Sequence, residues 1–252
     1  MEKRELVRDM VIATRYQLLQ DGWAVGKEAD IDNPKGRSVS VKIRVHKDLR
    51  KTIDWITTVL GHPQDRNIDF LTIHPRTRWT PSSTPINLEA LEILTSTFGT
   101  QVPILLSGDV FALNSLPFTT PLHTTNAPTF TTSDPSVPDA PSPSPLLKHI
   151  PHLSGLMSAR ALLANPALYA GYDHCPWSAV ETFLNKVVKA PLPFPLVLHH
   201  VNEMCGPGMG SNKTALLTRG ERSEMMNKCG NMVDLIDFLD EKRRGDGGIR
   251  RD

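Results

Sequence analysis

The sequence has few cysteines, and none of them are paired in a short motif. The three cysteines, Cys175, Cys205 and Cys229, are odd in number, widely spaced and without a Cys-x-x-Cys pair. This pattern argues against a disulfide scaffold and against a zinc site, and it is typical of a reducing compartment.

Long apolar runs and an excess of one charge are also missing. No run approaches the roughly 20 residues that a membrane span needs, and the opening MEKRELVRDM lacks the apolar core of a signal peptide. We therefore expect a protein outside the membrane, in the cytoplasm and also in the nucleus. Lys and Arg number 28 against 27 acidic residues, so any contact with RNA must come from a local patch.

The apolar pattern that is present alternates between strands and helices. Strands are expected over Val39–Val45, Ile68–Ile73 and Val102–Leu106, and helices over Glu2–Gln20, Asp48–Leu60 and Leu88–Thr97. Such alternation predicts an α/β fold with a parallel sheet and helical crossovers. By itself it leaves a barrel and a doubly wound sheet open.

The second half of the chain changes character twice. Residues 119–147 are rich in Pro, Thr and Ser, so we expect a disordered insertion within a first domain over residues 1–172. A glycosylated stalk and a translated intron are alternatives. Helical periodicity then predicts a small all-α domain over residues 173–240, before a disordered tail over 241–252. Its helices are expected at Pro176–Lys189, Leu196–Met204 and Glu221–Leu239.

Polar groups follow several of the expected strands. Lys42 and His74 stand at strand ends, Ser107-Gly108-Asp109 forms a turn, and Ala159-Arg160 opens a short helix. An ammonium could stabilise negative charge on a reduced flavin, and a turn with helix N–H groups could bind a phosphate. Each feature also has a plain structural reading as a solvated rim residue or an ordinary turn.

Four ordered segments carry a resemblance to a known family. VSVKIRVHKDLRKT, FLTIHPRTRWTPSSTP, VPILLSGDVF and LMSARALLANPALYAGY resemble successive signatures of tRNA-dihydrouridine synthases. The segments RTRWTPSSTP and SARALLANPAL are similar to those of the eukaryotic branch that acts at D-loop positions 20a and 20b. PWSAVETFLNKVV and LHHVNEM are similar to that branch's helical RNA-binding domain. The resemblance implies the second half of a TIM (β/α)8-type barrel followed by that domain.

The resemblance also implies an activity, cofactors and a partner. In such flavoproteins NADPH reduces FMN, which passes hydride to uridine in tRNA, so we expect an oxidoreductase acting on CH–CH bonds in tRNA processing. By position, the FMN-binding residues are expected to be Lys42, His74, Ser107, Gly108, Asp109, Ala159 and Arg160. RNA contacts are expected from Arg76, Arg78, His199 and His200. We expect a monomer and no metal.

Some family features are missing. None of the three cysteines matches the family's acid cysteine, so no catalytic residue is assigned, and the chain is expected to lack the preceding half-barrel. Ser107 stands where the family usually has Asn, and Pro75 where Gly is common. A non-catalytic tRNA-binding remnant is therefore the alternative function. Another FMN barrel oxidoreductase is disfavoured by the HPRTRW segment.

Overall fold

The computed structural model describes residues 3–26, 33–111, 150–210 and 213–246, which fall into two compact units. Among the described residues, unit 1 holds 3–26, 33–109 and 150–157, and unit 2 holds 110–111, 158–210 and 213–246. The predicted insertion over residues 119–147 lies outside the described residues.

Unit 1 is built on a four-stranded parallel sheet. The strands β3 (Ser40–Arg44), β6 (Phe70–His74), β7 (Ile104–Ser107) and β8 (Leu153–Met157) pair in the order β3-β6-β7-β8. The helices are α1 (Arg4–Gln20), α2 (Leu49–Leu60) and α3 (Leu88–Phe98). The predicted α/β class with a parallel sheet is confirmed.

Helix caps fix where the crossover helices begin. The Asp48 carboxylate accepts a hydrogen bond from the Arg50 N–H at the start of α2, and the Asn87 side chain accepts one from Ala90 N–H at the start of α3. Asp and Asn are favoured at this position because they satisfy backbone donors that have no partner within the helix.

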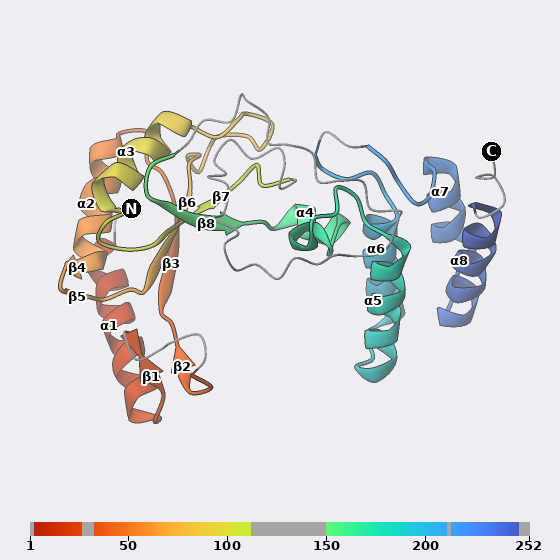
Figure 1. The fold of residues 1–252 in the computed structure, drawn as a ribbon, viewed down its shortest axis with the longest axis horizontal. Coiled ribbons are helices and arrows are strands. Elements are labelled where there is room, and N and C mark those ends of the chain that lie inside the picture. The colour runs from red at the N-terminus through yellow and green to blue at the C-terminus, as the bar shows by residue number, and fades with distance from the viewer. Residues whose placement is uncertain (1–2, 27–32, 112–149, 211–212, 247–252) are drawn as a thin grey trace. The chain divides into compact units, whose positions relative to one another are not determined.

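The two faces of the sheet differ in chemistry. Leu71, Ile73, Ile104 and Leu106 are fully buried on one face, and α2 and α3 lie on one side of the sheet (Figure 1). Because side chains alternate along a strand, the other face carries Lys42, Thr72, His74 and Ser107. The core of unit 1 therefore lies between the sheet and its helices, and the polar groups occupy the opposite face.

Helix α1 packs only part of its apolar side inward. Val11 is buried and Val7 and Leu18 are half-buried, whereas Leu6 and Met10 are 52% and 60% exposed. The helix is also joined to the sheet by an ion pair: Arg15 donates to the Asp69 carboxylate at 2.9 Å, with both side chains mostly buried. Asp69 directly precedes β6, so the pair connects α1 to the start of that strand.

Two short strand pairs complete unit 1. Strands β1 (Ala24–Val25) and β2 (Gly36–Arg37) pair in parallel, and β4 (Gly61–His62) and β5 (Asp65–Arg66) form an antiparallel hairpin. None of these two-residue strands was predicted, since a pair this short leaves no periodicity in the sequence.

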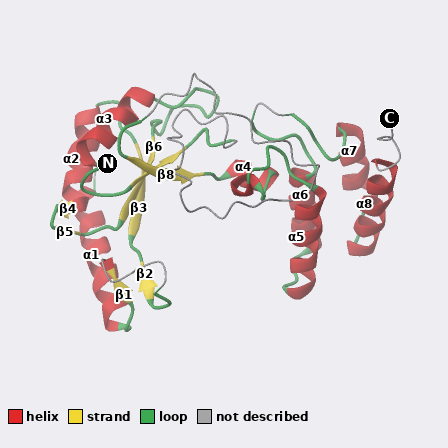
Figure 2. Cartoon of the chain, in the orientation of Figure 1, coloured by secondary structure: helices red, strands yellow, loops and turns green. Residues whose placement is uncertain are grey.

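In its described residues, unit 2 contains helices and no strand (Figure 2). They are α4 (Arg160–Ala164), the 3-10 helix η2 (Leu168–Ala170), α5 (Trp177–Lys189), α6 (Phe194–Met204), α7 (Arg219–Lys228) and α8 (Met232–Asp246). Residues of α5 to α8 share one core that includes Val180, Val201, Met225 and Leu235. No helix in the described ranges is long and apolar enough to cross a membrane.

The single helix predicted over Glu221–Leu239 is wrong. The structure has two helices, α7 and α8, separated at Cys229–Asn231. The Asn231 side chain accepts hydrogen bonds from the N–H groups of Val233 and Asp234, and the Asp234 carboxylate accepts from Gly230 N–H. This local cap satisfies the first donors of α8 and favours a break over a continuous helix.

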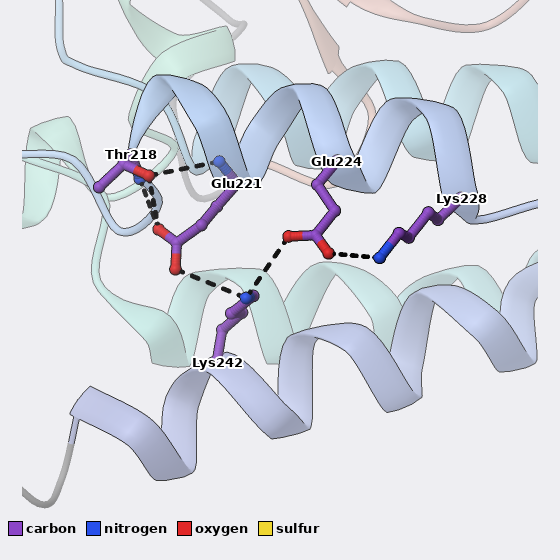
Figure 3. Close-up of polar contacts among 5 residues, drawn as sticks. All are labelled: Thr218, Glu221, Glu224, Lys228 and Lys242. Carbon is purple, nitrogen blue, oxygen red and sulfur yellow. Dashed lines mark hydrogen bonds and ion pairs between the residues drawn. The ribbon is translucent and has the colours of Figure 1, made fainter.

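The predicted disordered tail also begins too early, since α8 continues to Asp246. Within that part of α8, Lys242 lies between Glu221 and Glu224 of α7 (Figure 3), at 3.7 and 3.6 Å. Its ammonium also lies 5.1 Å from the centre of the Phe238 ring. Residues 247–252 lie outside the described residues.

Candidate functional site

Polar side chains from three neighbouring strands meet at the carboxyl end of the sheet in unit 1. Lys42 lies inside β3, two residues before its end, and not at the strand end that the sequence predicts. Its ammonium donates to the Ser107 hydroxyl at the end of β7, at 2.8 Å. β6 lies between these two strands, so the lysine side chain crosses it. Lys42 is exposed and Ser107 is buried. The cation therefore lies over the sheet and remains accessible to a ligand.

His74, the last residue of β6, packs directly against Gly108. A Cβ atom on Gly108 would lie 2.6 Å from His74 Cδ2 and 2.7 Å from Nε2, and Gly108 has φ +100°. Only glycine meets both conditions without strain. The imidazole therefore lies against the turn that follows β7.

The surroundings of His74 favour its neutral form. Burial, followed by the nearby Arg44, Arg76 and Lys42, lowers the pKa of His74 to about 4. Arg76 Nη1 lies 3.2 Å from His74 Nε2, and an arginine can only donate. Nε2 is then the acceptor, and the ring proton is assigned to Nδ1. At neutral pH His74 offers one donor beside the Lys42 cation.

Arg76 is buried in a network that joins two loops. Its Nη2 donates to Asp109 Oδ1 at 2.5 Å, and its Nε donates to the Thr84 carbonyl at 2.6 Å. The other Asp109 oxygen accepts from Ile86 N–H at 3.0 Å. We call Arg76, Asp109, His74 and Thr84 the Arg76 network. It connects the β6–α3 loop to the turn after β7.

A cavity of about 510 Å³ lies beside this site. It is lined by residues of the β3–α2 loop, the β6–α3 loop and the start of α3, including His46, Lys47, Thr77 and Glu89. Lys42, His74 and Ser107 do not line it. We base the candidate site on Lys42, His74 and Ser107, because these three side chains converge outside the cavity. No cluster of side chains that could hold a metal ion is found within the described residues.

Comparison with known proteins identifies the family. No family model matches the chain. An NAD(P)+-linked tRNA-dihydrouridine(20a/20b) synthase of Saccharomyces cerevisiae is 32% identical over 217 residues, which cover 84% of this chain and 48% of that protein. The protein of the same name from Schizosaccharomyces pombe is 31% identical over 201 residues, covering 80% and 48%.

The chain belongs to the tRNA-dihydrouridine synthase family. The human tRNA-dihydrouridine(20a/20b) synthase [NAD(P)+]-like protein is 24% identical over 239 residues, which cover 95% of this chain and 57% of the human protein. The chain spans about half the length of the curated relatives it matches.

In this member of the tRNA-dihydrouridine synthase family, the structure brings together the predicted cofactor residues of unit 1. These are Lys42, His74, Ser107, Gly108 and Asp109. Asp109 differs from the others, because both its oxygens are taken by Arg76 and Ile86. Asp109 therefore joins the two loops through Arg76, and its predicted role in cofactor binding stays a prediction.

Ala159 and Arg160 belong to unit 2, where both are exposed. Arg160 is the first residue of α4, a helix of only five residues, and Ala159 provides no side-chain cap. These two residues stay a prediction for phosphate binding.

The four residues that are predicted to contact RNA differ in how exposed their side chains are. Arg78 and His199 are exposed, whereas Arg76 is only 4% exposed. His200 is half-buried, with its ring against Phe183 at a centroid distance of 5.7 Å. An RNA phosphate could reach Arg76 only if its network broke, so the geometry argues against that one contact.

All three cysteines are buried in the core of unit 2. Burial raises the pKa of Cys175 and of Cys205 to about 12, and it is also the main cause that raises the pKa of Cys229. These side chains pack as small apolar groups, and none is assigned a catalytic role.

The sequence did not reveal the partners of Arg76. The Thr84 carbonyl and the Ile86 N–H are backbone groups and leave no signal in a sequence. Asp109 lies 33 residues from Arg76. Its position directly after a glycine at a strand end is the one signal in the sequence, and the family resemblance assigns that position to cofactor binding.

The low pKa of His74 predicts a measurable pH dependence. An unfolded histidine takes up a proton near pH 6.5, whereas folded His74 does so only near pH 4. Between these values the unfolded state binds more protons, so stability is complete above pH 6.5 and falls as the pH drops towards 4. NMR titration should show an imidazole with a midpoint near 4.

The variant His74→Gln serves as the control. It should lose that resonance, and its unfolding free energy should change less between pH 6.5 and 4. A His74 midpoint near 6.5 in the wild-type chain would contradict the burial and charge arguments.

Proposed function

We propose that this chain takes part in reducing uridine to 5,6-dihydrouridine in the D-loop of tRNA, at positions 20a and 20b, with FMN as cofactor and NADPH as reductant. The observation that carries the proposal is the meeting of Lys42, His74 and Ser107 at the carboxyl end of one parallel sheet. The named relatives support it, because both yeast proteins are NAD(P)+-linked synthases for these positions.

The architecture supports a partial barrel. A sheet of only parallel strands is normally covered on both faces, yet the face opposite α2 and α3 carries polar and half-exposed groups. We propose that the sheet is part of a TIM-type barrel, in which active sites lie at the carboxyl ends of the strands.

The residues of unit 1 fit the polar edge of a flavin. Lys42 supplies an exposed cation, the neutral His74 one N–H donor, and Ser107 a hydroxyl. Gly108 lets the imidazole pack against the turn after β7, because it has no side chain to occupy that space. Bound FMN would supply hydride transfer. The Lys42 ammonium would stabilise negative charge on the ring, and His74 would fix its orientation through Nδ1–H.

A spectrum of the purified chain would test the proposal. The expected result is the absorbance of oxidised flavin, which bleaches with NADPH, together with binding of an unmodified tRNA transcript. A colourless protein that still binds the transcript would support a tRNA-binding role without redox chemistry. A chain that binds neither flavin nor transcript would contradict both functions.

A further inference from the structure

Trp79 is an unusually exposed aromatic side chain in unit 1. Its exposed fraction is 82%, the highest among the exposed large apolar side chains of the described residues. Trp is highly buried on average, because its ring contributes a large apolar area. An indole that lies in solvent loses this contribution, so its position needs another explanation.

The loop around Trp79 is held in one conformation. The Thr77 and Thr80 hydroxyls are 2.7 Å apart, and the N–H groups of Trp79 and Thr80 both donate to the Thr77 hydroxyl, at 3.3 and 3.2 Å. Arg44 Nη1 donates to the Thr77 carbonyl at 3.0 Å. These bonds form a tight turn with Trp79 at its outer side.

The base of this loop is anchored as well. Asn87 N–H donates to the Pro75 carbonyl at 2.8 Å, which closes the two ends of the loop. The Arg76 network then ties the loop to the turn after β7. The exposed indole is therefore pre-organised, and binding to it would cost little conformational entropy.

The charges around Trp79 indicate an anionic partner. The Arg78 guanidinium lies over the indole ring, 5.1 Å from its centroid, and Arg44 is exposed beside Thr77. The loop from Pro75 to Asn87 contains no Asp or Glu. An exposed aromatic ring with one arginine over it and a second beside its loop suits a nucleobase, which stacks on the ring while its phosphates meet the cations.

We propose that Trp79 is a stacking platform for an unpaired base of the RNA substrate, with Arg78 and Arg44 contacting the flanking phosphates. This inference rests on the proposed function and names a specific contact within it. Stacking needs a free base face, so the platform binds single-stranded or loop nucleotides and does not distinguish the paired bases of a duplex.

The test is binding of a fluorescently labelled, unmodified tRNA transcript to the full chain, measured by anisotropy. Trp79→Ala should weaken binding about 5- to 150-fold, which corresponds to the loss of one base–aromatic stack. Trp79→Phe should retain most of the affinity, because it keeps a ring. Tyr16→Ala is the matched control: Tyr16 is also aromatic and 62% exposed, but it lies on α1 away from the strand ends.

Salt dependence separates stacking from electrostatics. Trp79→Ala should leave the slope of log K against log salt unchanged, whereas Arg78→Gln should reduce it by about one. Equal binding of the transcript by wild type and Trp79→Ala would overturn the stacking role and leave the proposed function intact. If the wild-type chain failed to bind the transcript at all, both would be overturned.

Discussion

Replacing Arg76 with methionine is expected to lower the free energy of unfolding of unit 1 by about 3 kcal/mol. The substitution removes a side chain that is only 3% exposed and leaves the partly buried Asp109 carboxylate without its cation. It also removes the donor to the Thr84 carbonyl. Denaturation by urea, followed by tryptophan fluorescence, would measure the change.

A double-mutant cycle identifies the cause. Asp109→Asn keeps the shape of the side chain and suits the positive φ of 55° at this position. If the pair matters as described, Arg76→Met and Asp109→Asn together should cost clearly less than the sum of the two single changes. Additive effects would show that Arg76 stabilises unit 1 independently of Asp109, through packing and its hydrogen bond to the Thr84 carbonyl. Arg50→Met, an exposed pair with Asp48, should change stability by less than about 1 kcal/mol.

Gly108→Ala is expected to destabilise unit 1 by about 2 kcal/mol and to displace His74. The new methyl group would lie 2.6 Å from the imidazole, and the backbone φ of +100° is unfavourable for alanine. Moving the ring outward would expose it to water, so its pKa should rise from about 4 towards its ordinary value. Denaturant unfolding and NMR titration of His74 measure the two effects.

Gly22 provides the control for backbone strain. It has φ +80°, but nothing lies within 4 Å of a Cβ atom built there. Gly22→Ala should therefore show the cost of the backbone alone and leave the titration of His74 unchanged. Equal effects of the two substitutions would mean that the imidazole does not pack on Gly108 as described.

Much of unit 1 could be predicted from the sequence because its signals are local. The apolar runs that end at Arg44, His74 and Ser107 are strands, and parallel strands present their carboxyl ends at one edge of a sheet. It follows that Lys42, His74 and Ser107 lie near one another. The α/β class and the closeness of these three side chains were therefore readable before the structure, whereas their role in binding a flavin stays a prediction.

The sequence could not give the features that depend on distant partners. Arg76 and Arg78 look alike in HPRTRW, yet one is buried against Asp109 and the other is exposed. Arg15 of α1 pairs with Asp69, 54 residues away. Lys242 of α8 pairs with Glu221 and Glu224 of α7. In each case a charged side chain pairs with a residue that is distant in the sequence and close in the fold. The hydrophobic periodicity of the sequence does not indicate such pairs.

Titration of the purified chain with FMN tests the central claim most directly. Flavin fluorescence should be quenched in a saturable way, and Lys42→Met should weaken binding about 10- to 100-fold, because it removes a charged hydrogen-bond donor. Lys51→Met, an exposed lysine on α2, should bind FMN as the wild type does. Unchanged affinity in Lys42→Met, or no quenching by the wild-type chain, would contradict a flavin site at these strand ends.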